Sequence, residues 1–355
     1  MSSHWHALIM AGGKGERFWP WSRGHRPKQL LPLFGKATLI EQTVARLLPL
    51  MPRKRIWIVT NASQARAMAR RMPRFPKDHF LVEPVGRDSS GAVMLGCATI
   101  ARRDPRAVMA LLPADHLIHD VRAYVRALAD SFRVAERTPC IVTLGIKPTS
   151  ASSAYGYIER AGPMRLPGVR TRIFHGRRFL EKPNAAAAAR FVRSGRHVWN
   201  AGMFLWSATT IRDAFRAHSP VHAAGWDALV AGPRQAAAYL RRGWRALPKI
   251  SIDYSVMEKT RNFAVVEGGF DWDDVGSWTA LAKHFPPDKT GNRLRGRVVS
   301  VNSRDCLVLG GTRAIGLLGV RDLIVVQTED ATLVCARDAA QRVKELVKLL
   351  PAKLR

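Results

Sequence analysis

The sequence predicts an α/β fold in which a doubly wound, mostly parallel Rossmann-like sheet is followed by a small all-β module. Two observations carry this prediction. Over residues 5–144, short apolar runs alternate with amphipathic segments, as in a parallel sheet with helices on both faces. From about residue 291, short Val, Leu and Ile runs are separated by Gly, Asn and Asp, which is typical of a β-helix-like coil. We therefore expect a large domain over residues 1–285 and a β-module with a terminal helix over residues 286–355.

Helix-capping residues punctuate the first domain. Thr38 followed by Glu41 forms a capping box, and Asn61 and Asp120 are suitable N-caps for later helices. In parallel sheets, ligands bind beyond the carboxyl ends of the strands, which places the loop after the first strand at that edge. Residues 83–88 and 113–116 are expected there too. The strands expected from apolar runs are 7–11, 55–60, 80–82, 107–112 and 140–144, with helices at 39–50, after 61, at 89–103 and at 121–136.

The middle of the chain reads as an insertion that supplies a second half-site. Strand-like segments occur at 155–159, 173–180 and 198–206, with helical segments between and after them. Residues 283–293, rich in Pro, Gly and charge, are the best candidate for a linker.

Composition favours a reducing compartment. The chain has 355 residues, of which 47% are hydrophobic, enough for a substantial core. The four cysteines, Cys97, Cys140, Cys306 and Cys335, lie singly in apolar runs, so we expect buried free thiols. No apolar run approaches the ~20 residues of a membrane helix, and the N-terminus lacks the pattern of a secretion signal. A cytoplasmic location is therefore expected.

The charge is strongly positive. Lys and Arg number 57 and Asp and Glu number 27, which gives +30. Such a surface could attract nucleic acid, but the cations are scattered singly and no basic block of five or more occurs. A solvated, arginine-rich surface is the favoured interpretation, with no nucleic-acid or membrane partner. It would still attract nucleoside triphosphates. A homodimer is compatible with the sequence.

The stretch from Trp5 to Gln29 carries the strongest chemical signal. Gly12, Gly13 and Gly15 follow the first apolar run, and cationic side chains follow the glycines. Glycines let backbone N–H groups approach an anion, and Arg and Lys neutralise its charge, so the stretch predicts a phosphate site. A Rossmann fingerprint would need glycine where Phe18 stands, and a P-loop would need Ser or Thr after Lys14. The alternative is a tight turn between strand and helix.

Two acidic positions are candidate metal ligands. Asp115 follows a buried strand, where a carboxylate facing a phosphate loop suits Mg²⁺; a turn-capping role is the alternative. A transition-metal site of His116, His119, Asp115 and Asp120 is a weaker alternative. Among the aromatics of residues 270–278, adjacent acids point in different directions, so one of Asp273 and Asp274 would be a ligand; the alternative there is a helix cap.

The insertion offers groups for a sugar phosphate. Lys182 follows Glu181 just before a proline at a strand end, where it could meet a second phosphate. Asn200 and the Tyr155–Tyr157 segment place hydrogen-bonding groups beside apolar strands, the mixture that a sugar site requires. Each of these features taken alone could be an ordinary strand end or turn.

Taken together, the motifs resemble one enzyme family. GGKGERFWPWSRGHRPKQLLPL resembles the signature of sugar-nucleotide pyrophosphorylases, and its Trp-Pro-x-Ser-Arg and Pro-Lys-Gln parts are similar to the mannose-1-phosphate guanylyltransferase branch. EPVGRDSSGAV, PADH, TLGIKP, YGYI, FLEKP, NAGMFLW, SIDYSVMEK and WDDVGSW follow in that family's order. The resemblance covers residues 5–285 strongly and the tail moderately.

This resemblance implies a nucleotidyltransferase whose catalytic domain is residues 1–285. It would transfer GMP from GTP to mannose 1-phosphate with Mg²⁺, giving GDP-mannose and pyrophosphate by in-line attack on the α-phosphate. Arg17 and Lys28 would be catalytic. The nucleotide would be bound by Ala11, Gly12, Gly13, Gly15, Arg17, Lys28, Glu83, Pro84, Gly86 and Asp115. The sugar phosphate would be bound by Gly156, Glu181, Lys182, Asn200 and Asp253, and the metal by Asp115 and Asp274.

Two segments depart from the family pattern. After Gly-Arg, the family has Asn-Thr-Ala-Pro, whereas this chain has Asp88, Ser89, Ser90 and Gly91. Before Tyr-Gly-Tyr, the family has Glu-Thr-Gly, whereas this chain has Ser-Ser-Ala at residues 152–154. The alternatives are therefore a nucleotidyltransferase for another sugar 1-phosphate or base, or a non-catalytic homologue that senses nucleotide sugars. Intact Lys28, Asp115, Lys182 and Asp274 argue against the second.

Overall fold

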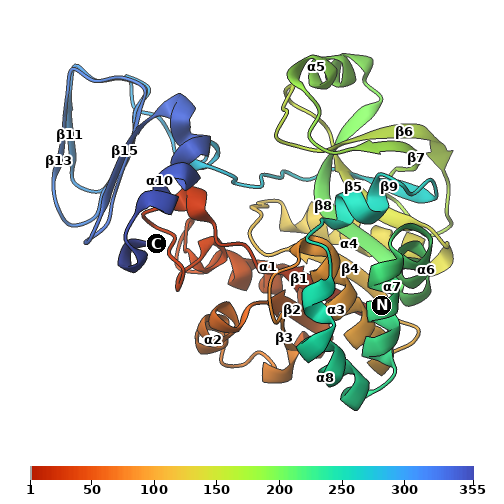
Figure 1. Cartoon of the computed structure of the whole chain (residues 1–355). Helices are drawn as coiled ribbons and strands as arrows, with labels where there is room; N and C mark the ends of the chain where they lie inside the picture. Colours follow the sequence, from red (N-terminus) through yellow and green to blue (C-terminus); the bar gives the residue numbers. More distant parts are fainter. Residues whose placement is uncertain (1) are drawn as a thin grey trace. The chain divides into compact units, whose positions relative to one another are not determined.

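The computed structural model describes residues 2–355, which form two compact units (Figure 1). The first unit comprises the chain up to Gly12 together with Glu41–Ala114 and Ile118–Trp272, and the second comprises Gly13–Ile40, Asp115–Leu117 and Asp273–Arg355. The division differs from the predicted boundary after residue 285, because residues 13–40 and 115–117 make most of their contacts with the C-terminal part of the chain.

A nine-stranded sheet forms the first unit, in the order β3-β2-β1-β4-β8-β5-β9-β7-β6. Pairing is parallel through β3-β2-β1-β4 and between β5 and β9, as the alternation of strands and helices predicts. The other pairings are antiparallel because the insertion forms a β6–β7 hairpin and sends β8 between β4 and β5. The sheet is thus mixed. The strands are β1 Trp5–Met10, β2 Ile56–Thr60, β3 Phe80–Val82, β4 Val108–Pro113, β5 Ile141–Ile146, β6 Tyr157–Met164, β7 Ile173–Leu180, β8 His197–Ser207 and β9 Phe263–Gly268.

Helices cover both faces of this sheet. Leu8 and Trp5 of β1 point to opposite faces because side chains alternate along a strand. Leu8 packs on α3 at Gly96, where an added Cβ would lie 2.2 Å from Cδ2 of Leu8. On the other face, Trp5 stacks on Phe132 of α4. The N-caps predicted at Asn61 and Asp120 form: Asn61 accepts from Gln64 N and Asp120 from Ala123 N. The helices are α1 Leu39–Leu47, α2 Ala62–Arg71, α3 Asp88–Arg103, α4 Val121–Arg137, α5 Ala185–Ser194, α6 Ala208–His218, α7 Pro220–Val230 and α8 Pro233–Arg242.

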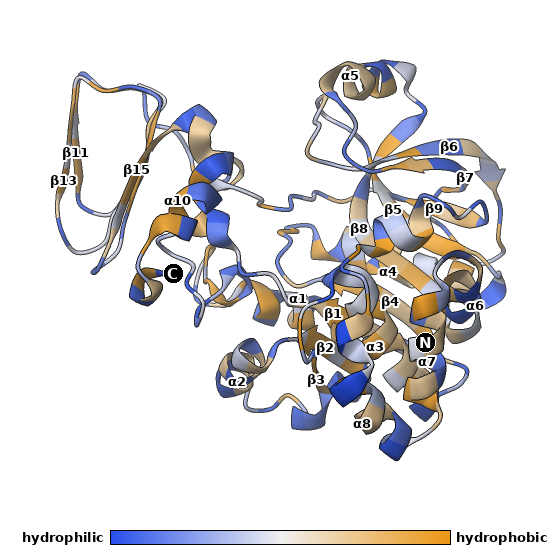
Figure 2. Ribbon diagram, in the orientation of Figure 1, coloured by the Kyte–Doolittle hydropathy of each residue, from blue (hydrophilic) through white to orange (hydrophobic). Residues whose placement is uncertain are grey.

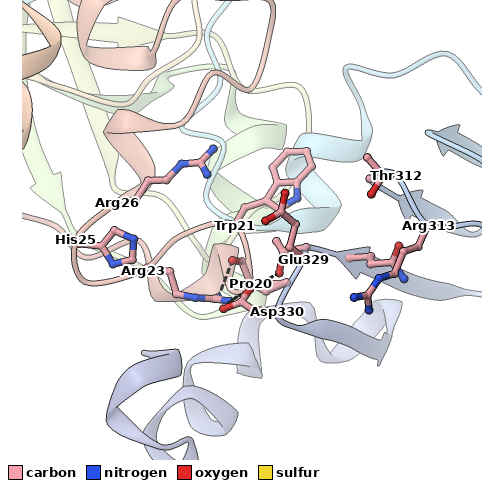
Figure 3. Close-up of a pocket in the computed structure, with 12 residues that line it drawn as sticks. Pro20, Trp21, Arg23, His25, Arg26, Thr312, Arg313, Glu329 and Asp330 are labelled. Carbon is pink, nitrogen blue, oxygen red and sulfur yellow. Dashed lines mark hydrogen bonds and ion pairs between the residues drawn. The ribbon is translucent and has the colours of Figure 1, made fainter.

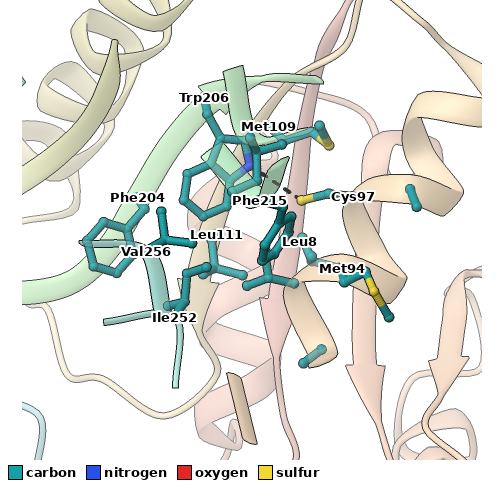
Figure 4. Packing of buried hydrophobic residues seen from close by; sticks show 14 of the residues in the cluster. Leu8, Met94, Cys97, Met109, Leu111, Phe204, Trp206, Phe215, Ile252 and Val256 are labelled. Atoms are coloured by element: carbon teal, nitrogen blue, oxygen red, sulfur yellow. Dashed lines mark hydrogen bonds between the residues drawn. The ribbon is translucent and has the colours of Figure 1, made fainter. Parts of the chain in front are cut away.

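The main core lies between the sheet and the helices α3, α6 and α7. Figure 4 shows Trp206, Phe215 and Leu111 around Leu8, and Figure 2 shows the apolar strands and helices of this unit. The indole N–H of Trp206 finds a partner in the Cys97 sulfur at 3.3 Å. All four cysteines are free thiols, as predicted; three are buried as expected, whereas Cys335 is only half-buried.

The second unit contains the predicted β-module. Strands β10, β12 and β14 stack in parallel, and β15 pairs antiparallel with β14; β11 and β13 form a second parallel pair. One face of the larger sheet buries Val308 and Val325 inside the coil, while the other packs against Phe18 and Trp278. The strands are β10 Arg293–Arg295, β11 Val298–Val301, β12 Leu307–Leu309, β13 Ile315–Leu318, β14 Leu323–Gln327 and β15 Thr332–Ala336, with helices α9 Trp278–Ala282 and α10 Val343–Leu349.

Among residues 2–355, no helix combines the length and apolar character needed to cross a membrane.

Candidate active site

The end of β1 begins the site in the first unit. Ala11 continues the strand edge: its N–H donates to Val59 O, and its carbonyl accepts from the Thr60 hydroxyl at 2.7 Å. Gly12 follows, and a Cβ added there would lie 3.7 Å from Oε2 of Glu83. The structure therefore brings Glu83 beside Gly12, at the carboxyl ends of two parallel strands, β3 and β1, that flank β2 in the same sheet.

Glu83 has an unusual electrostatic setting. Burial raises its pKa, the Arg87 backbone N–H lowers it, and the Asp88 carboxylate raises it further, to about 7. A carboxyl group with this pKa changes its protonation state near neutrality. The next residues, Pro84 and Gly86, are exposed, and the Val85 carbonyl between them accepts from the Trp244 indole at 2.7 Å.

The departure at residues 88–91 has a structural explanation. Asp88 adopts a left-handed φ of 62°, which Asp tolerates better than most residues. The Ser89 hydroxyl accepts from Ile252 N at 2.8 Å, and Ser90 bonds Ser255 across a 2.6 Å contact. A Cβ at Gly91 would lie 2.8 Å from the Arg87 Cβ. This segment is thus fastened to residues 251–255, a pairing that the sequence alone did not reveal.

The glycine loop continues in the second unit, where Gly15 is the position that demands glycine. Its φ is +65°, and a Cβ there would lie 2.4 Å from the Cβ of Lys28. Its carbonyl accepts from the Ser22 hydroxyl at 2.6 Å. By contrast, a Cβ at Gly13 would meet nothing within 4 Å. The turn at Gly15 therefore sets the position of Lys28.

Lys28 is the centre of the charged cluster in the second unit. Its side chain is 7% exposed, and its Nζ lies 2.9 Å from Oδ2 of Asp115 and donates to the Asp274 carbonyl oxygen at 2.6 Å. Burial alone would raise the pKa of Asp115, but the Lys28 ammonium outweighs it and the pKa is lowered. The two side chains are therefore an ion pair at neutral pH. Three residues far apart in sequence meet here.

The neighbouring acids have different roles. Asp273 is committed to the fold: its Oδ1 accepts from Val275 N at 2.7 Å, and its Oδ2 lies 2.9 Å from Nε2 of His284. Oδ1 of Asp274 accepts a longer bond of 3.2 Å from Gly276 N. Because both carboxylate oxygens of Asp273 are held within the fold, Asp274 stays the candidate ligand of the two.

The donor set suits a magnesium ion that shares its shell with substrate. Mg²⁺ takes one or two carboxylates plus phosphate oxygens and water, and Asp115 and the Asp274 segment both lie against Lys28. Over residues 2–355, no group of three or more His, Cys, Asp or Glu side chains could hold a metal by itself. The transition-metal alternative therefore has no supporting cluster, and Asp120 caps α4 instead.

Arg17 holds the loop from its exposed position. Its Nη1 donates to the Gly276 carbonyl oxygen at 2.8 Å and to Oε1 of Gln341 at 3.2 Å. In this arrangement Arg17 fastens the glycine loop to the segment that carries Asp274. Gln341 lies in a helical turn near the chain end, and no sequence signal pointed to it.

The predicted sugar-phosphate residues meet in the first unit. Gly156 leaves room for Glu181, since a Cβ there would lie 2.4 Å from Oε2 of Glu181. The Asn200 amide donates to Oδ1 of Asp253 at 3.2 Å, and its backbone N–H donates to the Gly156 carbonyl. Lys182 Nζ lies 3.1 Å from Oε1 of Glu181. Five residues from four segments thus form one cluster.

The charges in this cluster are unevenly satisfied. Burial raises the pKa of Asp253, and the Glu181 carboxylate raises it further, to about 6. Burial would lower the pKa of Lys182, but Glu181 outweighs it and the pKa is raised. Oε2 of Glu181 is buried and accepts no hydrogen bond within residues 2–355. A buried carboxylate oxygen without a donor is costly, so the cluster is built to receive a donor from a ligand.

Sequence reasoning missed two supports of this cluster. Glu258 accepts from the Glu181 backbone N–H at 3.0 Å. Tyr155 lies between Trp199 and Trp272, with ring centroids 4.9 and 5.2 Å away. Glu258 belongs to the SIDYSVMEK motif and Tyr155 adjoins Gly156, so their motifs, but not their contacts, were visible in the sequence.

The two units, each taken by itself, carry the features of one class of protein: an α/β enzyme with polar clusters suited to phosphorylated ligands. A family model described as nucleotidyl transferase matches residues 6–290, and one described as a MannoseP isomerase/GMP-like beta-helix domain matches residues 296–350. The chain therefore belongs to the nucleotidyl transferase family, and within it to the mannose-1-phosphate guanylyltransferase group, as its full-length relatives show.

These relatives align over nearly the whole chain. Xanthan biosynthesis protein XanB of Xanthomonas campestris pv. campestris is 34% identical over 96% of this chain and 72% of its own length. A mannose-1-phosphate guanylyltransferase of Klebsiella pneumoniae is 33% identical over 97% of this chain and 73% of its own. A solved structure from Thermus thermophilus, described as mannose-1-phosphate geranyltransferase, has a TM-score of 0.86 and 40% identity, covering 98% of this chain and 99% of that one.

Proposed function

We propose that this enzyme transfers GMP from GTP to mannose 1-phosphate, forming GDP-mannose and pyrophosphate. The observation that carries the proposal is the Gly156–Glu181–Asn200–Asp253 cluster, with the unpartnered Glu181 oxygen and the adjacent Lys182. Acceptors without donors suit sugar hydroxyl groups, and a lysine suits the phosphate on the same sugar. Relatives named mannose-1-phosphate guanylyltransferase support this choice of sugar.

The reaction needs positioning and charge neutralisation rather than a protein nucleophile. A phosphate oxygen of mannose 1-phosphate attacks the α-phosphorus of GTP; a P–O bond forms there, and the bond to the β-phosphate oxygen breaks and releases pyrophosphate. Lys28 neutralises charge at the reacting phosphate and Arg17 that of the triphosphate, while the backbone N–H groups of the glycine loop orient it. Asp115 and Asp274 would hold Mg²⁺, which supplies further charge neutralisation on the phosphate oxygens.

Glu83 is assigned to the base. The edge of guanine presents two kinds of N–H donor, and a carboxylate accepts from both, whereas adenine lacks this pair of donors. The Glu83 pKa of about 7 fits a group that ionises fully once it receives donors. Pro84 and Gly86 would border the same base.

The test is pyrophosphate release from the pure protein with Mg²⁺, mannose 1-phosphate and each of GTP, ATP, UTP and dTTP. Release with GTP alone supports the proposal. Release with another nucleotide keeps the reaction and overturns the assignment of the base. Release with GTP only when a different sugar 1-phosphate is present overturns the assignment of the sugar.

The remaining proposals follow from the same assignment. No release with any pair, from protein with a cooperative melting transition, would favour a homologue that binds nucleotide sugars without turnover. A cytoplasmic location fits the proposal, since nucleoside triphosphates are cytoplasmic substrates, and the homodimer stays a prediction. Relatives named for xanthan and alginate biosynthesis support a role in supplying GDP-mannose to polysaccharides.

A further inference from the structure

A pocket of the second unit contains none of the residues assigned to the reaction. It has a volume of about 410 Å³ and lies between the loop of residues 20–26 and the strand ends at residues 311–313 and 327–330. In Figure 3, His25 and Arg26 lie on one side of the view, Thr312 and Arg313 on the other, and Trp21 and Glu329 between them. We call it the loop–coil pocket.

The loop–coil pocket carries unneutralised positive charge. Arg23 is matched within the protein, because its Nη2 lies 3.0 Å from Oδ1 of Asp330 and its Nη1 donates to the Pro20 carbonyl. The side chains of Arg26 and Arg313 have no hydrogen bond or ion pair anywhere in residues 2–355. They outnumber Glu329, the one remaining carboxylate among the described residues of its lining, so the pocket favours an anion.

The cationic side of the pocket is held in a fixed shape. Arg23 and Arg26 exchange two backbone hydrogen bonds of 3.0 Å, which close a tight turn and present the Arg26 side chain. The Arg23–Asp330 pair ties this turn to the strand end opposite. The backbone at Arg26 is therefore fixed and only the side chain must be ordered when an anion binds, and its guanidinium fork suits phosphate.

Two further groups point to a ligand larger than phosphate. Trp21 is half-buried and held edge-on by Trp278 at 5.3 Å between centroids, so its indole is a fixed aromatic wall. Gln327, also in the wall, has an Oε1 that is shielded from solvent and accepts no hydrogen bond within residues 2–355. An aromatic wall beside an unsatisfied acceptor suits a flat ring with N–H donors.

We propose that the loop–coil pocket binds a nucleoside diphosphate at a second site, separate from the residues assigned to the reaction. Arg26 and Arg313 bind the two phosphates, and the base lies against Trp21 with an N–H directed to Glu329, or to Gln327 after a rotamer change that turns its shielded Oε1 into the pocket. The volume falls within the ~300–1,000 Å³ typical of small-molecule pockets. Free phosphate would use the arginines but leave Trp21 and Gln327 without a role.

The test counts GDP molecules bound per chain by equilibrium dialysis at fixed salt, for the wild-type chain and three variants. Arg313→Glu reverses one unpaired charge of the pocket. Arg297→Glu is the matched control, since Arg297 is an exposed arginine of the same unit that lies outside the pocket. Lys28→Ala weakens the catalytic site alone. Melting temperatures establish that each variant is folded, and Arg313→Ala replaces Arg313→Glu should that chain unfold.

We expect Arg313→Glu to lose one GDP per chain, with at least a tenfold weaker affinity at that site, while Arg297→Glu and Lys28→Ala retain it. Inorganic phosphate at the same concentration should compete weakly. Equal GDP binding by Arg313→Glu and Arg297→Glu would overturn the proposal, as would loss of all GDP in Lys28→Ala. If the proposed reaction is wrong but the loop–coil pocket binds GDP, the wild-type chain would bind one GDP per chain. Of the variants, only Arg313→Glu would lose that GDP.

Discussion

At the scale of single residues, Lys28 combines two duties that can be separated by experiment. It is buried beside Asp115, so Lys28→Ala removes the proposed phosphate contact and also leaves a carboxylate without its partner. We expect turnover to fall by more than ~100-fold, the loss seen when one preorganised charge-stabilising donor is removed. The measurement is pyrophosphate release at saturating substrates.

The matched controls isolate the catalytic part of this loss. Lys14→Ala removes a loop lysine whose side chain is 74% exposed, and turnover should stay within a few fold of wild type. Adding Asp115→Asn to Lys28→Ala removes the unpaired charge, so the melting temperature should recover, and this variant is read by melting temperature alone because Asp115 is itself a proposed metal ligand. Lys28→Arg keeps a cation beside Asp115, and wild-type turnover in Lys28→Ala at a temperature where that chain is fully folded would mean that Lys28 acts through stability only.

Glu83 gives a prediction on pH. Its folded pKa of about 7 lies above the ordinary value of 4.5, so the folded state binds an extra proton between these values. The native state is therefore penalised as the pH rises through this window, by up to ~3 kcal/mol before discounting for solvent. Glu83→Gln should raise the melting temperature relative to wild type at pH 8 and leave it unchanged at pH 4. An equal change in melting temperature at pH 8 and pH 4 would contradict the raised pKa of Glu83.

At the scale of elements, the glycine loop shows how one backbone angle positions a functional side chain. Gly15→Ala would force a Cβ into Lys28 at a φ of +65°, and should destabilise the protein by ~1–3 kcal/mol. Gly13→Ala is the control, because its Cβ meets nothing within 4 Å and no left-handed φ is involved. Chemical denaturation of both variants is the measurement, and a Gly15→Ala chain as stable as Gly13→Ala would refute the requirement.

The elements that sequence could predict are those whose signal is local. Strands β1–β5 and their helices follow from apolar runs and caps at Asn61 and Asp120, which act within three residues. The antiparallel position of β8 between β4 and β5 depends on contacts across the insertion, so no local pattern encodes it. The roles of Gln341 and Glu258 in fastening the site are hidden for the same reason.

The candidate site was predictable to the extent that motifs lie at strand ends. Parallel strands bring their carboxyl ends to one edge, so Gly12 and Glu83 could be expected to meet, and they do. What the motifs did not reveal is that Lys28 donates to the Asp274 backbone as well as pairing with Asp115. That contact depends on residues 13–40 packing with the C-terminal part of the chain, which no short-range pattern specifies.

At the scale of the whole molecule, the charge of +30 remains the least specific feature of the sequence. Scattered cations create a long-range electrostatic field that concentrates anions near the surface but does not distinguish one anion from another. For the proposed reaction, this field should speed the encounter with a triphosphate and leave the chemistry unaffected. The field is screened beyond a Debye length of ~10 Å at 0.1 M salt.

We therefore expect kcat/KM for GTP to fall several-fold between about 50 and 300 mM NaCl while kcat stays nearly constant. Choline chloride at equal ionic strength is the control, since a sodium-specific effect would differ from screening. Duplex DNA gives the complementary measurement: affinity in the micromolar range at about 150 mM salt, with a steep salt slope, would show that the cations form a nucleic-acid surface instead. A parallel fall in kcat would mean that salt disturbs the Lys28–Asp115 pair rather than the encounter.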